Sequence, residues 1–160
     1  VHHMVADFWS LGVLARELGA AYSARESRAK LLPLAGDYLA FGRMLLERGR
    51  PGPERILSRP SVEAMTTDQL TPAQKAASGL VDGYFDSHGW GFGVGMVTRR
   101  ENPSEPVGQF GWDGGLGTSW RCDPQEDVVA VLMTQRAWVS PNPPAVCRDF
   151  WTLVYAAIGD

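Results

Sequence analysis

Three stretches of the chain carry apolar residues at three- and four-residue steps, which is the spacing of one buried helix face. The first stretch predicts a helix over residues 3 to 24. The second predicts a helix that begins at Asp37, a suitable N-cap, and ends at Gly49, ahead of a loop rich in proline. The third runs from residue 144 to residue 158 and predicts a helix that covers the strands described next.

A pattern of period two, typical of β-strands, begins at Trp90. Bulky residues there alternate with glycines up to Met96, so we expect one strand with a bulky face and a bare face. Further strands are expected over residues 107–112, 117–122 and 128–134, the last a continuous apolar run that suits a central strand. A polar, proline-containing run separates the last two and predicts a hairpin turn. Together these strands predict an antiparallel meander.

Between the second helix and the first strand the pattern is less regular. Ser58 predicts the N-cap of a short helix that has Pro60 in its first turn. Residues 66 to 89 are polar and interrupted, so we expect an exposed connection there. This order of helices, antiparallel meander and covering helix predicts an α+β fold with helices on one face of a sheet.

The composition is that of an ordinary globular domain: the 160 residues are 44% hydrophobic and 21% charged. A net charge of -3, with the basic residues scattered along the chain, argues against a nucleic-acid partner. Cys122 and Cys147 lie far apart and lack metal-ligand spacing, so we expect two reduced thiols rather than a zinc site or a disulfide. No metal and no cofactor are expected.

Charged residues interrupt the apolar positions near the N-terminus. Asp7, Arg16 and Glu17 argue against both a signal-peptide core and a membrane span in the first twenty residues. The chain as written is therefore expected to be cytoplasmic and to have no membrane span. Because it begins with Val1, an export signal could still lie upstream.

One short sequence carries potential chemistry. Ser27 and Lys30 form S-x-x-K, in which a lysine amine can activate a serine for acyl transfer. With ten serines and two lysines in the chain, a chance match is not rare. Pro33 also stands where the active motif would need an unbroken helix. We therefore interpret this match as a coincidence.

Several consecutive segments after residue 35 agree in order and spacing with one known family: Gly36 to Leu46, Leu57 to Thr67, Trp90 to Val97, Phe110 to Trp120, Asp123-Pro124, Glu126-Asp127 and Val131 to Gln135. They closely resemble the C-terminal part of β-lactamase-related serine hydrolases, which include class C β-lactamases, penicillin-binding D-alanyl peptidases and esterases. The resemblance implies the C-terminal portion of the β-lactamase/transpeptidase-like fold, with an antiparallel sheet covered by helices. It divides the chain into an unrecognised helical segment, residues 1–34, and a family domain, residues 35–160.

The resemblance also implies a site. In the family a serine of S-x-x-K attacks a carbonyl, a tyrosine of Y-x-N shares the proton transfer, and a third motif lies on a strand that borders the cleft. Trp112, Asp113 and Gly114 occupy the place of the third motif and are implied to bind substrate. Gly115 matches the position whose backbone N–H helps to form the oxyanion hole, so it is implied to be catalytic. Strand alternation places Trp112 and Gly114 on one face and Asp113 elsewhere, where its role would be structural.

Two departures from the family bear on activity. No tyrosine of the chain is followed two residues later by asparagine, so Y-x-N is absent, and Ser27 falls far downstream of the family's nucleophile. We expect a portion of a serine hydrolase that acts on a small ester, amide or β-lactam but is inactive alone, because it lacks the half with nucleophile and base. The alternative is a non-catalytic remnant or binding module of the same fold. A missing half would expose apolar surface, so self-association is expected.

Overall fold

The computed structural model describes residues 32–158 of the chain. By its internal contacts the chain divides into two units, Val1–Asp37 and Tyr38–Asp160. The second unit contains the sheet and is described here. The helix expected over residues 3–24 lies outside the described residues, as do both residues of the S-x-x-K match.

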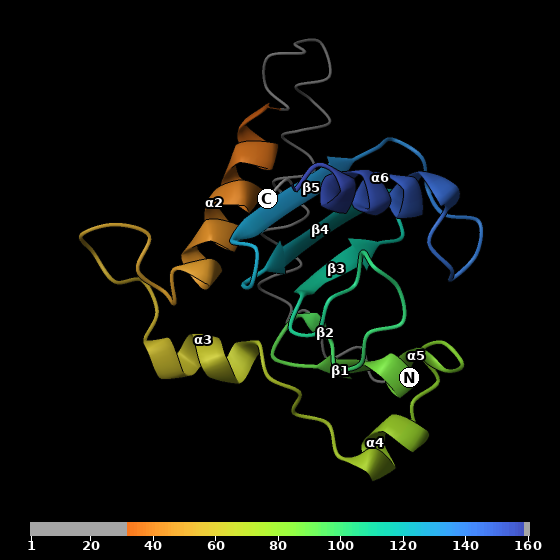
Figure 1. Cartoon of the computed structure of the whole chain (residues 1–160). Helices are drawn as coiled ribbons and strands as arrows, with labels where there is room; N and C mark the ends of the chain where they lie inside the picture. The colour runs from red at the N-terminus through yellow and green to blue at the C-terminus, as the bar shows by residue number, and fades with distance from the viewer. Residues whose placement is uncertain (1–31, 159–160) are drawn as a thin grey trace. The chain divides into compact units, whose positions relative to one another are not determined.

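Within residues 32–158, five strands form one antiparallel sheet, in the order in which they follow each other along the chain (Figure 1). The expected meander is therefore confirmed, and β4 and β5 are joined at the predicted polar turn. The expectation of a central strand over residues 128–134 is wrong, because within the described residues β5 pairs with β4 alone and lies at the edge of the sheet. The strands are β1 (His88–Trp90), β2 (Gly95–Val97), β3 (Phe110–Gly114), β4 (Thr118–Asp123) and β5 (Val128–Met133).

The single strand expected from Trp90 to Met96 is wrong, because this segment is a hairpin. Trp90 ends β1 and pairs with Gly95, which begins β2. The turn between them is closed by a hydrogen bond from the Gly91 N–H to the Val94 carbonyl at 2.9 Å. Gly93 has a φ of 90°, which side-chain-bearing residues rarely adopt. The glycines that looked like the bare face of a strand thus make the reversal instead.

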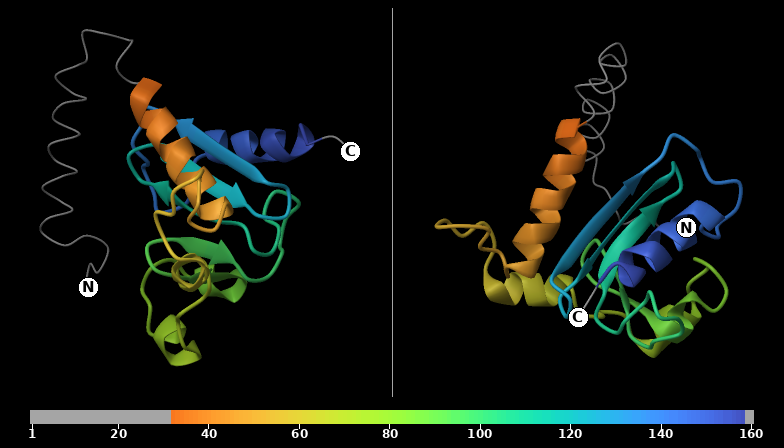
Figure 2. Two further views of the ribbon diagram at one scale, coloured as in Figure 1. Left: turned by 90° about the vertical axis from the view of Figure 1, so that its left-hand side faces the viewer. Right: turned by 45° about the horizontal axis from the view of Figure 1, so that its top comes forward.

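Helices pack on both faces of the sheet, so the expectation of helices on one face is wrong (Figure 2). α2 (Leu32–Leu46) places Tyr38 and Phe41 edge-on against Trp120, at centroid distances of 5.8 and 5.6 Å. α6 (Ala145–Ala156) lies on the opposite face, where Trp151 and Tyr155 donate hydrogen bonds to polar side chains of β4. The cause is the alternation of β4, which presents apolar residues to α2 and polar residues to α6.

The ends of α2 and the start of α3 (Arg59–Met65) test the predicted helix caps. α2 already includes Leu32, the first described residue, so the expected start at Asp37 is wrong, and Pro33 lies within the helix without interrupting it. At its other end the Gly49 N–H donates to the Met44 carbonyl at 2.8 Å, so the predicted stop at Gly49 is confirmed. α3 (Arg59–Met65) is capped as predicted by Ser58, whose hydroxyl accepts from the Ser61 N–H at 3.1 Å.

The connection over residues 66–89 is not simply exposed, as had been expected from its polarity. It contains α4 (Pro72–Ala76) and α5 (Tyr84–Ser87). Asp68 anchors it to β1 by accepting a hydrogen bond from the Trp90 N–H at 3.1 Å, and it pairs with Lys75 of α4, whose ammonium also donates to the His88 carbonyl of β1 at 3.3 Å. These partners allow a polar segment to pack against the sheet.

The apolar core lies between α2, α3 and one face of the sheet. Its buried members are Met44, Leu45, Val62, Val94, Met96, Phe110, Trp120 and Cys122. Cys122 and Cys147 are both buried and form no disulfide. None of the helices within residues 32–158 is long and apolar enough to cross a bilayer.

The contact between α2 and the sheet yields a stability prediction. A β-carbon at Gly42 would lie 2.6 Å from Val129 Cγ1 and 3.1 Å from Cys122 Sγ, whereas one at Gly36 in the same helix would meet none of residues 32–158 within 4 Å. Gly42→Ala should lower the free energy of unfolding by about 1–3 kcal/mol through overpacking. Gly36→Ala should raise it by about 0.5–1 kcal/mol, since alanine is the better helix former. Urea denaturation measures both, and equal effects would contradict the close helix–sheet contact.

Candidate functional site

The segment singled out by the sequence lies at the end of β3. Asp113 and Gly114 are the last two residues of the strand, and Gly115 is the first residue of the turn that follows. Trp112 is 36% exposed and lies edge-on to Trp90, with 4.5 Å between ring centroids. This placement leaves one edge of the Trp112 side chain open to an incoming molecule.

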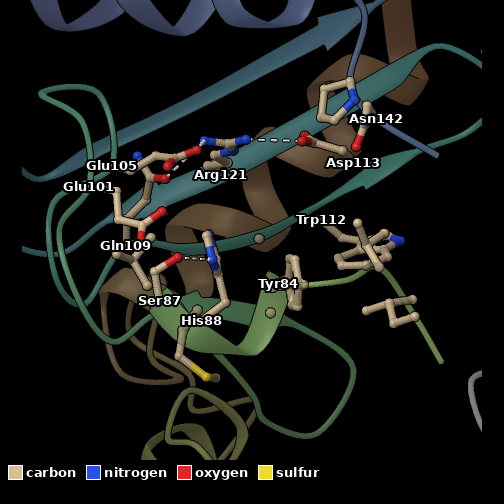
Figure 3. Close-up of a pocket in the computed structure, with 18 of the residues that line it drawn as sticks. Tyr84, Ser87, His88, Glu101, Glu105, Gln109, Trp112, Asp113, Arg121 and Asn142 are labelled. Carbon is tan, nitrogen blue, oxygen red and sulfur yellow. Dashed lines mark hydrogen bonds and ion pairs between the residues drawn. The ribbon is translucent and has the colours of Figure 1, made fainter. Parts of the chain in front are cut away.

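Asp113 is tied to the neighbouring strand. Its Oδ1 accepts a hydrogen bond from the Ser119 hydroxyl, and its Oδ2 accepts from Arg121 Nη2 at 2.9 Å (Figure 3). Ser119 in turn accepts from the Trp151 Nε1–H at 2.7 Å. Both carboxylate oxygens of Asp113 are thus occupied by partners from β4, and this face of the strand is fixed to α6.

The turn after β3 is held by hydrogen bonds that its backbone carbonyl groups accept from the segment after β5. Gly117 has a φ of 99°, and its carbonyl accepts from both the N–H (2.9 Å) and the hydroxyl (2.8 Å) of Thr134. The Gly115 carbonyl accepts from the Trp138 N–H at 2.8 Å. The segment after β5 therefore clasps the turn at two points.

Gly115 itself is exposed, and a β-carbon added to it would meet nothing within 4 Å. Among the hydrogen bonds formed within residues 32–158, none has the Gly115 N–H as its donor. A fixed, exposed and unpartnered backbone N–H can donate to an oxygen atom that is brought to it.

A cavity of about 420 Å³ lies beside this strand end. Figure 3 shows Tyr84 and His88 on one side of it and Arg121 and Asp113 on the other. Trp112 also lines the cavity, whereas Gly114 and Gly115 do not. The structure thus brings two of the four predicted site residues to the cavity and leaves the other two at the rim of the sheet.

On one wall of the cavity, the side chains of His88 and Tyr84 are uncharged at pH 7. His88 stacks on Tyr84 at 4.6 Å, and burial lowers the pKa of its imidazole. Burial likewise raises the pKa of Tyr84, so the phenol keeps its proton. Ser87 Oγ lies 2.9 Å from His88 Nδ1, but Ser87 is only 3% exposed. Both residues line the cavity, and Ser87 is bonded to the His88 imidazole.

Sequence reasoning did not identify Ser119, Arg121 or Trp138, which shape the surroundings of the strand end. The alternation of β4 offers one signal, because Ser119 and Arg121 occupy the same face as Asp123. Nothing in the sequence indicates that Trp138, which lies beyond β5, contacts Gly115.

Comparison with known proteins relates most of the chain to one family. The family model described as Beta-lactamase matches residues 8–145. The match begins within the segment 1–34 that the sequence pattern left unrecognised. Two proteins of Mycobacterium tuberculosis are each 38% identical to the chain over 107 residues: Protein Rv1367c (strain ATCC 25618 / H37Rv) and Uncharacterized protein MT1414 (strain CDC 1551 / Oshkosh). The matched part is 63% of this chain and 26% of each relative, so the chain spans about a quarter of their length.

Solved structures of simvastatin synthase (LovD) from Aspergillus terreus are similar to the chain. The LovD6 mutant gives a TM-score of 0.59 at 20% sequence identity, over 77% of this chain and 34% of that one. The unliganded enzyme gives a TM-score of 0.56 at 21% identity, over 76% and 34% of the two chains. At such identity the likeness establishes a common fold.

Two tryptophans near the site differ in their hydrogen bonding, which yields a prediction. Within residues 32–158, the buried Nε1–H of Trp138 has no partner, whereas that of Trp151 donates to Ser119. Trp151→Phe should lower the free energy of unfolding by about 2–4 kcal/mol, because it shrinks a buried ring and removes a partner of Ser119. Trp138→Phe should cost less than about 1 kcal/mol, because it also removes an unsatisfied donor. Thermal and urea unfolding test this, and a larger loss for Trp138→Phe would contradict it.

Proposed function

Because the chain belongs to the beta-lactamase family, we propose that it supplies the substrate-binding strand and one oxyanion-hole donor of a serine acyl-transfer site. The strand is β3, and the donor is the backbone N–H of Gly115. The substrate class is a small ester, amide or β-lactam, and the reaction proceeds through an acyl-serine.

The observation that carries this proposal is the backbone N–H of Gly115, which lies in a fixed turn and has no partner within residues 32–158. When a serine attacks a carbonyl, negative charge develops on the carbonyl oxygen, and a fixed N–H that points at this oxygen lowers the barrier. Gly115 lies in a turn that is clasped by Trp138 and Thr134, yet its own N–H has no partner within residues 32–158. The Gly115 N–H is held in place but bonds to none of residues 32–158, and this supports a role as an oxyanion-hole donor.

The third motif favours neutral substrates. It contains no lysine, and the cation nearest to it, Arg121, is already paired with Asp113 at 2.9 Å and with Glu105 at 3.3 Å. Arg121 is therefore not free to attract a substrate carboxylate. Trp112 offers an apolar edge instead, which suits the acyl or leaving group of a small ester or amide.

In this proposal the nucleophile and the base lie outside residues 32–158. Ser87 lines the cavity but is only 3% exposed and lies outside the family's S-x-x-K motif, and Ser27 is interpreted as a chance match. The competing hypothesis is a binding module of the same fold that performs no chemistry. Activity measurements on the chain alone, and on the chain within a larger relative, separate the two hypotheses.

The isolated chain should not hydrolyse p-nitrophenyl esters or a chromogenic cephalosporin faster than buffer does, because in this proposal the nucleophile and the base come from the part of the family domain that the chain does not supply. A fluorophosphonate probe should leave it unlabelled, and Ser27→Ala should change nothing. Turnover or labelling that disappears in Ser27→Ala would show that the S-x-x-K match is functional.

A chimera tests the oxyanion donor. Residues 35–160 replace the corresponding segment of Protein Rv1367c, and the chimera and its parent are assayed on the same substrates. Gly115→Pro deletes the N–H and should lower kcat by about 10²–10³-fold. Gly115→Ala keeps the N–H and has room for its β-carbon, so its kcat should stay near that of the chimera.

Circular dichroism and thermal unfolding must show that both variants are folded. A folded Gly115→Pro chimera with full kcat would refute the role of Gly115. A folded chimera that is inactive on substrates of an active parent would favour the binding module.

A further inference from the structure

Arg121 is the centre of a polar cluster between the sheet and α6. Its side chain is 16% exposed, and its guanidinium lies 4.9 Å from the centre of the Trp151 ring. Nη1 donates to Glu105 at 3.3 Å and to Gln109 at 3.2 Å, while Nη2 donates to Asp113 at 2.9 Å. Arg121 therefore links Asp113 to the segment that precedes β3 (Figure 3).

The cluster continues into α6. The side-chain amide of Gln109 donates to the Tyr155 hydroxyl at 2.7 Å, and this hydroxyl donates to Asp123 Oδ2 at 2.7 Å. Gln109 and Asp123 are buried. Every charged member of the cluster thus has a partner, and the partners come from β3, β4, α6 and the loop before β3.

Stability alone does not account for an ion pair in this place. Removing a carboxylate and a guanidinium from water costs about as much as their attraction returns, and an apolar pair of similar volume is often at least as stable. What such a pair does provide is a defined geometry, because a guanidinium bonds its partners in fixed directions. A neighbouring part of the molecule that depends on these fixed directions would account for the Arg121–Asp113 pair.

The nearest candidate is Gly115. It lies two residues after Asp113, has no side chain, and is held by the bond of its carbonyl to the Trp138 N–H and by its neighbours in the chain. On its C-terminal side the clasps from Trp138 and Thr134 hold the turn. On its N-terminal side the bonds of Asp113 to Ser119 and Arg121 hold the strand. The Gly114 carbonyl, which shares a peptide plane with the Gly115 N–H, also accepts from the Gly117 N–H at 2.9 Å. Loss of the Asp113 bonds would leave this plane held by the hydrogen bonds of the turn alone.

We propose that Arg121 is a positioning residue that acts through Asp113 to fix the direction of the Gly115 N–H. This inference rests on the proposed function, in which that N–H binds the developing oxyanion. It assigns Asp113 to the support of the turn, and it leaves substrate contact to Trp112 and Gly114. Ser119, which also bonds to Asp113, has the same role.

The test follows the Gly115 amide of the whole chain by ¹⁵N relaxation, which requires no enzymatic activity. Arg121→Gln should lower the order parameter of this amide from about 0.85, the value of a rigid backbone, to below about 0.6. Arg121→Lys keeps a cation beside Asp113 and should restore most of the order. The matched control is Arg43→Gln, which removes an arginine from exposed pairs with Asp127 and Glu47 and should leave Gly115 unchanged.

A rigid Gly115 amide in folded Arg121→Gln would overturn the proposal. A loss of order spread evenly over β5 and Gly115 would do the same, because it would assign general stability to Arg121. If Arg121→Gln does not fold, Ser119→Ala decides: a loosened Gly115 supports the proposal and a rigid one overturns it.

In the chimera, Arg121→Gln should lower kcat about tenfold at unchanged KM, because the N–H acts on the transition state. The two hypotheses can fail separately. A loosened Gly115 amide together with an unaffected Gly115→Pro kcat would refute the oxyanion role alone. A rigid amide in Arg121→Gln together with loss of kcat in Gly115→Pro would refute the positioning role alone.

Discussion

The two faces of β4 determine how the rest of the unit packs. This strand is hydrogen-bonded on both edges, to β3 and to β5, so only its side chains remain to contact other layers. Trp120 and Cys122 face α2 and contribute to the apolar core. Ser119, Arg121 and Asp123 face α6, where burying polar groups is tolerable only if each finds a partner. One six-residue strand thus fixes which helix covers which face.

The polar face of β4 needs hydrogen-bonding groups on α6, so an amphipathic helix with a purely apolar face could not replace α6. Trp151 and Tyr155 lie four residues apart on one side of the helix, and each combines an apolar ring with a polar tip. Their tips meet Ser119 and Asp123, and the Trp151 ring also packs against the Arg121 guanidinium. The helix therefore contributes both apolar burial and hydrogen bonds, and the bonds define where along β4 it docks.

Short sequence patterns predicted the elements that depend on residues close together in the chain. The apolar run of β5, the stop of α2 at Gly49 and the cap of α3 by Ser58 depend on residues within one or two turns of chain. The hairpin at Trp90–Val97 was missed because a glycine can serve either a bare strand face or a reversal. The cluster around Arg121 was missed for a different reason: Trp151 lies 32 positions from Ser119, and no periodicity relates them. Of the candidate site, sequence resemblance therefore yielded the strand end but not its supports.

The turn after β3 contains two glycines that differ in physical origin. Gly117 is required by the fold, since its φ of 99° suits glycine and a β-carbon there would collide with the Arg136 carbonyl and the Thr134 hydroxyl. Gly115 has no such requirement: its φ is not positive, and a β-carbon would meet nothing within 4 Å. Packing within residues 32–158 thus leaves the glycine at 115 unexplained. Glycine also lets another molecule approach the backbone closely, and a carbonyl oxygen that accepts the 115 N–H needs such an approach. Gly36, Gly52 and Gly79 share this lack of close contacts, so the open space alone does not mark a site. What distinguishes Gly115 is its place at the end of β3, where the proposed acyl transfer would use its N–H.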